Sequence, residues 1–206
     1  MTTEPGLYVI AAPSGAGKTT LVKALVERNP ELRFSVSYTT RTQRKNEIEG
    51  KDYYFVTQQE FFRLRDAGAL LEHACVFDNY YGTGREQVER HLRAGRHVIL
   101  EIDWQGARQV RGAMPGCRTI FILPPSRAEL ERRLRNRRTD SDSVIERRLR
   151  DALSDMSHWH EFDYCIVNER LEAAVDELMA VLEGDGTASR TDNPALRRRV
   201  GEILSL

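Results

Sequence analysis

The sequence predicts an α/β fold in which helices cover both faces of a central parallel sheet. Short apolar segments rich in Val and Ile alternate along the chain with segments whose apolar residues recur at helical spacing. Strands that are apolar on both faces are typical of parallel sheets buried between two layers of helices. Residues 34–84 and 126–157 depart from this alternation, and they predict a small inserted α+β lobe and a helical lid on a three-layer core.

The predicted strands and helices outside the lobe alternate along the chain. Residues 7–12 form an apolar strand, and residues 20–28 form an amphipathic helix. Ser126 and Glu129 have the spacing of a capping box, which predicts a helix through Leu134. Further strands are predicted at residues 97–102, 118–123 and 164–167, and further helices at residues 105–113 and 171–182.

The inserted lobe and the C-terminal segment differ from the core in composition. Aromatic and polar residues alternate near residues 34–40 and 52–56, and an amphipathic helix is predicted over residues 58–66. Residues 184–193 lack periodicity and predict a flexible linker before a short helix near residues 194–204. The predicted units are core with a glycine-rich loop (1–33), lobe (34–84), core (85–125), lid (126–157), core (158–183) and linker with tail (184–206).

Charge and hydropathy exclude several classes of function. Lys plus Arg and Asp plus Glu both number 31 among 206 residues, so there is no overall field for nonspecific binding of nucleic acid or an anionic membrane. No apolar run approaches the roughly 18 residues of a membrane span, and the first residues do not resemble a signal peptide. We therefore expect a cytoplasmic protein, and the choice between a monomer and a homo-oligomer stays open.

The cysteines and one pair of histidines do not have the spacing of metal ligands. Cys75, Cys117 and Cys165 lie in apolar sequence without a CxxC pattern, which predicts buried reduced thiols. His158 and His160 lie two residues apart in a predicted helix, so they point in different directions and are expected on the surface.

The strongest motif is a glycine-rich loop between the first strand and the first helix. Ala12-Pro-Ser-Gly-Ala-Gly-Lys-Thr19 matches the phosphate-binding pattern GxxxxGK[ST] except at its first position, where Ala replaces Gly. Backbone N–H groups of such a loop surround phosphate oxygens, the lysine reaches the outer phosphates, and the threonine hydroxyl binds magnesium. The loop predicts a nucleoside triphosphate site formed by Ser14, Gly15, Ala16, Gly17, Lys18, Thr19 and Thr20, with Thr19 as the metal ligand.

The arginines indicate a second, anionic substrate. Four of the cations are lysines and the others are arginines, whose planar guanidinium groups suit phosphate. Many of these arginines lie in the predicted lid, and the sequence lacks the guanine-reading Asn-Lys-x-Asp of switch GTPases. An arginine-rich lid together with a polar lobe predicts phosphate transfer from the triphosphate to a small anionic acceptor.

The inserted lobe carries a series of motifs that resembles guanylate kinases. They are Ser37-Tyr-Thr-Thr-Arg41-Thr-Gln-Arg44, Glu49-Gly-Lys-Asp-Tyr53, Glu72, Asn79-Tyr-Tyr81-Gly-Thr83 and Leu100-Glu-Ile-Asp103-Trp-Gln-Gly106. With the glycine-rich loop and the lid, the resemblance extends from about residue 7 to about residue 182. It implies transfer of the terminal phosphate of ATP to GMP, and also to dGMP, with Mg²⁺.

Glu72, Ser37 and Thr83 also suit guanine on chemical grounds alone. Guanine presents a ring N–H and an amine that require acceptors, and a carboxylate such as Glu72 accepts from both while the two hydroxyls adapt. The resemblance places Asp103 near guanine, with the magnesium shell as the alternative, and Glu101 is expected to be structural or to support the site indirectly. The resemblance assigns four further residues to the GMP phosphate, namely Arg41, Arg44, Tyr53 and Tyr81.

Three residues are predicted to be catalytic, namely Lys18, Arg137 and Arg148. The two arginines resemble lid arginines of guanylate kinases, but the family usually has Gly where this chain has Arg138. Arg137 and Arg138 are therefore alternatives for the contact with phosphate. The resemblance places Asn168 on the adenine side of the ATP site, and its alternative role is the N-cap of the following helix.

Two other functions are alternatives to GMP phosphorylation. A sugar-phosphate kinase would keep the glycine-rich loop but would not need a carboxylate and two hydroxyls to read a base. A noncatalytic guanylate-kinase-like module would bind a phosphorylated peptide in the lobe, and the intact Lys18 and Thr19 argue against it. For a nucleotide acceptor, the second phosphate pKa of about 6 makes the phosphate nucleophilic at neutral pH, so no general base is predicted.

Overall fold

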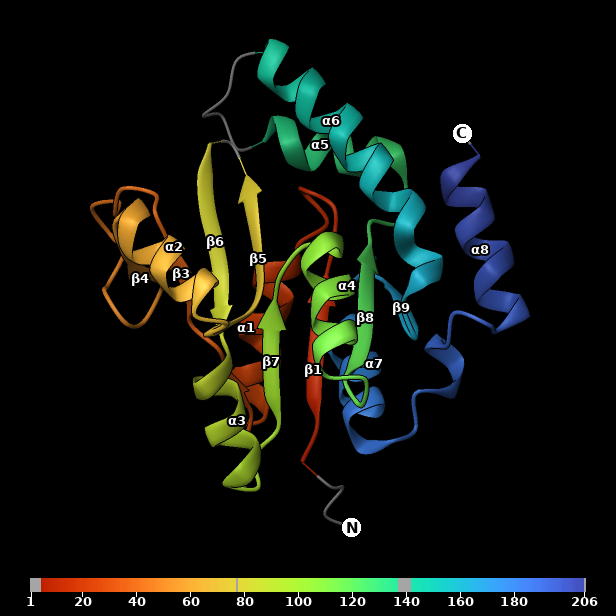
Figure 1. The fold of residues 1–206 in the computed structure, drawn as a ribbon. Coiled ribbons are helices and arrows are strands. Elements are labelled where there is room, and N and C mark those ends of the chain that lie inside the picture. The colour runs from red at the N-terminus through yellow and green to blue at the C-terminus, as the bar shows by residue number, and fades with distance from the viewer. Residues whose placement is uncertain (1–4, 77, 137–141, 206) are drawn as a thin grey trace.

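The structure is a computed structural model that describes residues 5–76, 78–136 and 142–205. Its larger sheet has the strand order β2-β7-β1-β8-β9, and each pairing between these strands is parallel (Figure 1). This sheet confirms the predicted α/β class. The strands are β1 (Leu7–Ala11), β2 (Arg33–Phe34), β7 (Val98–Glu101), β8 (Arg118–Leu123) and β9 (Tyr164–Val167).

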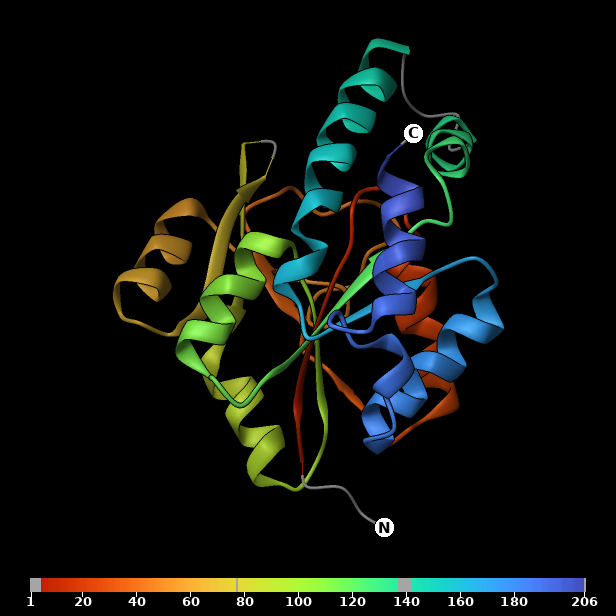
Figure 2. The ribbon, with the colours of Figure 1, turned by 90° about the vertical axis from the view of Figure 1, so that its right-hand side faces the viewer.

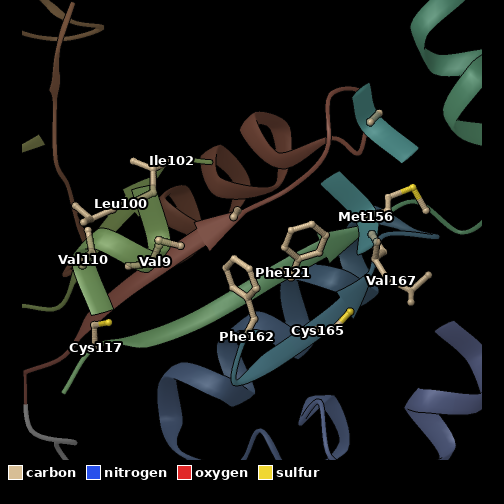
Figure 3. Packing of buried hydrophobic residues seen from close by; sticks show 14 of the residues in the cluster. Val9, Leu100, Ile102, Val110, Cys117, Phe121, Met156, Phe162, Cys165 and Val167 are labelled. Atoms are coloured by element: carbon tan, nitrogen blue, oxygen red, sulfur yellow. The ribbon is translucent and has the colours of Figure 1, made fainter. Parts of the chain in front are cut away.

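Two apolar clusters pack on the opposite faces of this sheet. Neighbouring residues of β1 separate between them, because successive side chains of a strand point to opposite faces: Val9 belongs to one cluster and Ile10 to the other. Helices α1 (Lys18–Arg28) and α7 (Leu171–Glu183) contribute to the cluster of Ile10, and α4 (Trp104–Ala113) contributes to that of Val9. Figure 3 shows the cluster of Val9 from close by. The sheet is therefore the middle of three layers.

A second sheet forms the inserted lobe. Its strand order is β4-β3-β6-β5, in which β3 pairs in parallel with β4 and the other two pairings are antiparallel. Helix α2 (Gln58–Asp66) has the predicted bounds, and the side chain of Thr57 caps it by accepting a hydrogen bond from the backbone N–H of Glu60. The strands are β3 (Ser37–Thr39), β4 (Tyr54–Phe55), β5 (Leu70–Val76) and β6 (Asn79–Gly84). The lobe boundaries at residues 34 and 84 stay predictions.

Helix α3 (Arg85–Arg93) is an element that the sequence pattern did not predict. It follows β6 without a loop, and Val88 is its single buried residue. Leu92, four residues after Val88, packs partly buried against the cluster of Val9, so the apolar face of α3 consists of one pair in an otherwise charged segment.

Helices α5 (Arg127–Arg135) and α6 (Asp142–Met156) form the lid and lie above the carboxyl ends of the core strands (Figure 1). The predicted cap is confirmed, because Ser126 Oγ accepts a hydrogen bond from the backbone N–H of Glu129 at 3.1 Å. Leu134 of α5 and Met156 of α6 are buried in the same cluster as the sheet residues. The lid is therefore anchored on the core by apolar packing.

The C-terminal segment packs against the core more extensively than expected of a flexible linker and tail. Ser189, at the end of a 3-10 turn (Thr187–Ser189), is buried and donates to Glu177 Oε2 at 3.0 Å, and Arg190 forms a bridge with Tyr164 of β9. The predicted helix is present as α8 (Pro194–Leu204), which buries Val200 and Ile203. Individual hydrogen bonds, rather than an apolar face, hold residues 184–193 against the core. This explains why their sequence shows no apolar periodicity.

The cysteines correct one prediction. Cys117 and Cys165 are buried thiols as expected, but Cys75 is exposed because burial along β5 falls toward its end.

A second 3-10 turn (Ser157–Glu161) follows α6 and contains both histidines. Among the described residues, no helix is both long and apolar enough to span a membrane.

Replacing Leu178 by Ala should destabilise the protein by about 2–5 kcal/mol. Leu178 is fully buried where α7 packs in the cluster of Ile10, so truncation leaves a cavity. Urea unfolding measures the change in the free energy of unfolding. Val144→Ala is the control, because Val144 is 43% exposed on α6. Equal effects of the two substitutions would contradict this account of the core.

Candidate active site

A cavity of about 700 Å³ opens between the lobe and the carboxyl end of β7. In open α/β sheets, ligands bind at the carboxyl ends of the parallel strands. The cavity collects predicted residues from three separate parts of the chain: Lys18, Thr19, Ser37, Tyr53, Glu72, Tyr81 and Asp103. The structure thus joins the glycine-rich loop and the lobe in one site.

The glycine-rich loop requires glycine at two positions. Gly15 and Gly17 both have φ of +91°, a conformation that side chains with a Cβ rarely adopt. A Cβ on Gly17 would also lie 2.6 Å from Asn168 Nδ2, and one on Gly15 would lie 3.0 Å from Leu130 of the lid. The loop continues directly into α1, whose first N–H groups suit an anion. Thr20 lies in the first turn of α1 and is exposed.

Lys18 and Thr19 contact the end of strand β7. Lys18 Nζ donates to the carbonyl oxygen of Ile102 at 2.8 Å, and Thr19 Oγ1 donates to Glu101 Oε1 at 2.5 Å. Burial lowers the pKa of Lys18, while the charges of Glu101 and Asp103 act in the opposite direction. Glu101 therefore contacts the candidate metal ligand directly, which agrees with the second of its two expected roles, indirect support of the site. Its place at the end of an apolar strand is the signal that could have identified it.

Glu72 and Thr83 form a buried pair at the predicted guanine subsite. The register of β5 and β6 sets them opposite each other, and Thr83 Oγ1 donates to Glu72 Oε1 at 2.6 Å. Ser37 of β3 is the partner of Thr83 on the other side of β6. Burial raises the pKa of Glu72 to about 7, and the negative charge of Asp103 adds to this shift. Asp103 itself accepts from the backbone N–H of Gly106 at 2.7 Å and caps α4.

The predicted GMP-phosphate residues lie around a carboxylate that the sequence reasoning missed. Glu47 Oε1 lies 2.6 Å from Nη2 of Arg41, and Glu47 Oε2 accepts from the backbone N–H of Arg44 at 2.8 Å. The Arg41 guanidinium lies 5.4 Å from the ring centroid of Tyr53, which is in edge contact with Tyr81. Arg41 lowers the pKa of Glu47. The regular three-residue spacing of Arg41, Arg44 and Glu47 is the sequence feature that could have identified Glu47.

On the ATP side, a lid arginine reaches the glycine-rich loop. Arg148 Nη2 donates to Ser14 Oγ at 2.8 Å. Asn168 is buried and donates from Nδ2 to the carbonyl oxygen of Ala16 at 2.9 Å, whereas the N-cap of α7 is Arg170, so the capping alternative is wrong. Arg137 and Arg138 lie outside the described residues.

Arg133 of α5 is a second residue that the sequence reasoning did not single out. Its guanidinium donates to the carbonyl oxygens of Ala16 at 3.2 Å and Asn168 at 3.1 Å, and its Nε donates to Glu129 Oε1 at 2.7 Å. It was one of several similar lid arginines, and periodicity alone does not distinguish the one that faces the loop.

Comparison with known proteins identifies the family. The guanylate kinase family model matches residues 4–185. The chain belongs to the guanylate kinase family. A guanylate kinase from Methylococcus capsulatus is 52% identical over 98% of this chain and 99% of its own length, and one from Alkalilimnicola ehrlichii is 49% identical over 97% and 99%. The crystal structure of guanylate kinase from Anaplasma phagocytophilum has a TM-score of 0.73 at 35% identity, covering 98% of this chain and 97% of that chain.

Membership of the guanylate kinase family confirms the predicted enzyme class, a nucleoside monophosphate kinase. Neither a sugar-phosphate kinase nor a noncatalytic module is favoured by these relatives.

Replacing Gly17 by Ala should weaken ATP binding at least tenfold, because both its positive φ and its contact with Asn168 exclude a methyl group. Isothermal titration with a nonhydrolysable ATP analogue measures the affinity. Gly112→Ala on α4 is the matched control, since a Cβ there meets no atom within 4 Å. Unchanged affinity in Gly17→Ala would contradict the proposed loop geometry.

The KM for GMP should rise roughly tenfold as the pH falls from 8 to 6, because Glu72 must be ionised to accept from guanine and its pKa is about 7. Steady-state kinetics across this range measures it. In Glu72→Gln, which cannot ionise, only the titration of the GMP phosphate should remain. Since the folded-state pKa is raised above 4.5, ionisation should also destabilise the free protein as the pH rises from about 4.5 to about 7. A wild-type KM that follows the Glu72→Gln profile would exclude this role.

Proposed function

We propose that the protein transfers the terminal phosphate of ATP to GMP, giving ADP and GDP. The buried carboxylate of Glu72, in the cleft that also contains Lys18, is the observation that carries this proposal. A carboxylate at this depth accepts from the ring N–H and amine of guanine, whereas adenine would present a ring acceptor to it. An unpaired buried polar group of this kind strongly disfavours the wrong base.

The acceptor phosphate is assigned to the lobe, where Arg41, Arg44, Tyr53 and Tyr81 supply donors. Arg41 already pairs with a carboxylate, that of Glu47, so its guanidinium is held in a position where anions bind. The tyrosine hydroxyls supply neutral donors that add hydrogen bonds without adding charge. Guanine then extends toward Glu72, Ser37, Thr83 and Asp103.

ATP is assigned to the glycine-rich loop, with its phosphates on the backbone of residues 14–20. Asn168 and Arg133 both contact the carbonyl oxygen of Ala16, which supports an adenine subsite on that side of the loop. The N-terminus of α1 favours the negative charge of the phosphates.

Catalysis consists of bringing two anions together and neutralising the charge that moves. The GMP phosphate is already nucleophilic at neutral pH, so positioning and electrostatics supply the rate increase. We assign Lys18 and Arg148 to the transferred phosphate, with Arg137 or Arg138 as a third cation. Arg148 lies at Ser14, which supports its reach toward the loop. A lid closed over both nucleotides also excludes water, which would otherwise hydrolyse ATP.

The residues at the loop fit a magnesium ion. Mg²⁺ prefers hard oxygen ligands and is usually held by one or two protein groups together with substrate phosphates. The hydroxyl of Thr19 and the carboxylate of Glu101 adjoin each other, and both would hold the ion directly or through water. Within the described ranges, no cluster of three or more His, Cys, Asp or Glu side chains suits a metal, which agrees with a site completed by ATP. When bound, the ion neutralises phosphate charge.

Two further assignments follow from the substrates. dGMP should also be an acceptor, because none of the residues assigned here reads the ribose 2′-hydroxyl. We place the protein in the cytoplasm, where its nucleotide substrates occur and where its three free thiols would stay reduced.

An ADP-release assay with ATP, Mg²⁺ and a panel of acceptors tests the proposal. GMP and dGMP should be phosphorylated, and AMP, UMP and ribose 5-phosphate should react at least a hundredfold more slowly. Equal turnover of AMP and GMP would exclude the guanine assignment. Phosphorylation of ribose 5-phosphate would favour a sugar-phosphate kinase, and turnover of no acceptor would favour a binding module.

A further inference from the structure

A network of ring and polar contacts joins the base of the lid to the start of helix α4. The indole N–H of Trp104 donates to Asp155 Oδ1 at 3.0 Å. Trp104 is the first residue of α4, and Asp155 lies in the last turn of α6. Figure 2 shows this end of α6 beside α4.

The Trp104 ring is fixed independently of that hydrogen bond. It stacks on the His158 ring with centroids 3.6 Å apart and planes 12° apart, and the Arg108 guanidinium lies 4.6 Å from its centroid. Glu161 accepts two hydrogen bonds from Arg108, each at 2.6 Å, and lies 2.7 Å from His158 Nδ1. The stack therefore holds the indole in one orientation, and the N–H···O bond is the part of the network that reaches α6 itself.

Both ends of this bond adjoin reacting parts of the site. Trp104 directly follows Asp103, which caps α4 at the GMP subsite. Asp155 lies about two helical turns after Arg148, so the two side chains leave the same face of α6. A shift of α6 relative to α4 would therefore move Arg148 relative to both the glycine-rich loop and Asp103.

The electrostatics place Asp155 at the edge of the site. Burial and the negative charge of Asp103 raise the pKa of Asp155, and the negative charge of Asp155 in turn raises the pKa of Lys18. Yet neither Trp104 nor Asp155 is among the residues that line the cavity. The pair lies close enough to set the geometry of the site without occupying the space of a substrate.

We propose that Trp104 and Asp155 are positioning residues that fix lid helix α6 against α4, so that Arg148 is aligned with the acceptor subsite during phosphate transfer. The inference rests on the proposed function. Because the pair acts on alignment and does not line the cavity, its loss lowers kcat more than it raises either KM.

Trp104→Phe is the direct test, because it keeps an aromatic ring for the stack and removes the N–H. The kcat should fall roughly tenfold, while the KM values for ATP and GMP should change less than about threefold. Asp155→Ala should match it, and Asp155→Asn, whose amide oxygen still accepts, should recover most of the activity. The double variant Trp104→Phe with Asp155→Ala should be no worse than either single variant.

Trp159→Phe is the matched control, because it is the same substitution at a tryptophan of the neighbouring 3-10 turn. The Trp159 side chain packs against the core. The kcat of this control variant should be unchanged. Wild-type kcat in Trp104→Phe would overturn the proposal, as would additive losses in the double variant or equal losses in Asp155→Asn and Asp155→Ala. A lower melting temperature with normal kcat would assign the pair to stability alone.

A binding measurement separates this inference from the proposed function. The sequence contains two tryptophans, so Trp104 is the remaining one in Trp159→Phe. Adding a nonhydrolysable ATP analogue to Trp159→Phe should change the fluorescence of Trp104. In the double variant Trp159→Phe with Asp155→Ala, this response should be abolished while the analogue still binds. Persistence of the response would overturn the positioning role. Absence of GMP turnover in the wild type would instead contradict the proposed function.

Discussion

The placement of one ammonium group among several carboxylates constrains the rest of the site. The parallel register pairs Ile10 of β1 with Glu101 of β7, and the glycine-rich loop that follows β1 therefore brings Lys18 to the end of β7. The negative charges of Glu101, Asp103 and Glu72 all raise the pKa of Lys18. Removing the lysine would leave these carboxylates without their shared counter-charge in a partly buried cleft, where unpaired charge is costly.

Several cations of the site already have partners in the structure. Arg41 pairs with Glu47, Arg133 with Glu129, and Arg148 donates to Ser14. Binding of nucleotide phosphates to such groups is an exchange of one polar partner for another, so its net free energy is smaller than the strength of the new bonds. In return, the guanidinium groups are held near their working positions, which reduces the entropy lost when substrates bind.

Local patterns predicted most of the core, but contacts between distant segments could not be read from them. β8, β9 and α2 have the expected bounds because apolar runs and alternating patterns record burial directly. α3 was missed because its apolar face consists of one pair, Val88 and Leu92, in a charged segment. Glu72, Ser37 and Thr83 were grouped by chemistry and family resemblance, and strand register places them side by side. Arg133 depends on its side chain reaching Ala16 and Asn168 in distant segments, which leaves no periodic trace in the sequence. Glu47, in contrast, contacts arginines three and six residues before it in the same loop.

The lid and the inserted lobe differ in how they pack against the core. Leu130, Leu134, Ile145, Ala152 and Met156 of the lid share one apolar cluster with β1, β7 and β8, so the lid base and the sheet should unfold as one cooperative unit. The lobe has its own sheet, its helix α2 buries Phe61 outside both large clusters, and the lobe joins the cluster of Val9 through Leu71 of β5. Local opening of the lobe therefore need not disrupt the central sheet, and amide hydrogens of β3 and β6 should exchange with solvent before those of β1 and β8.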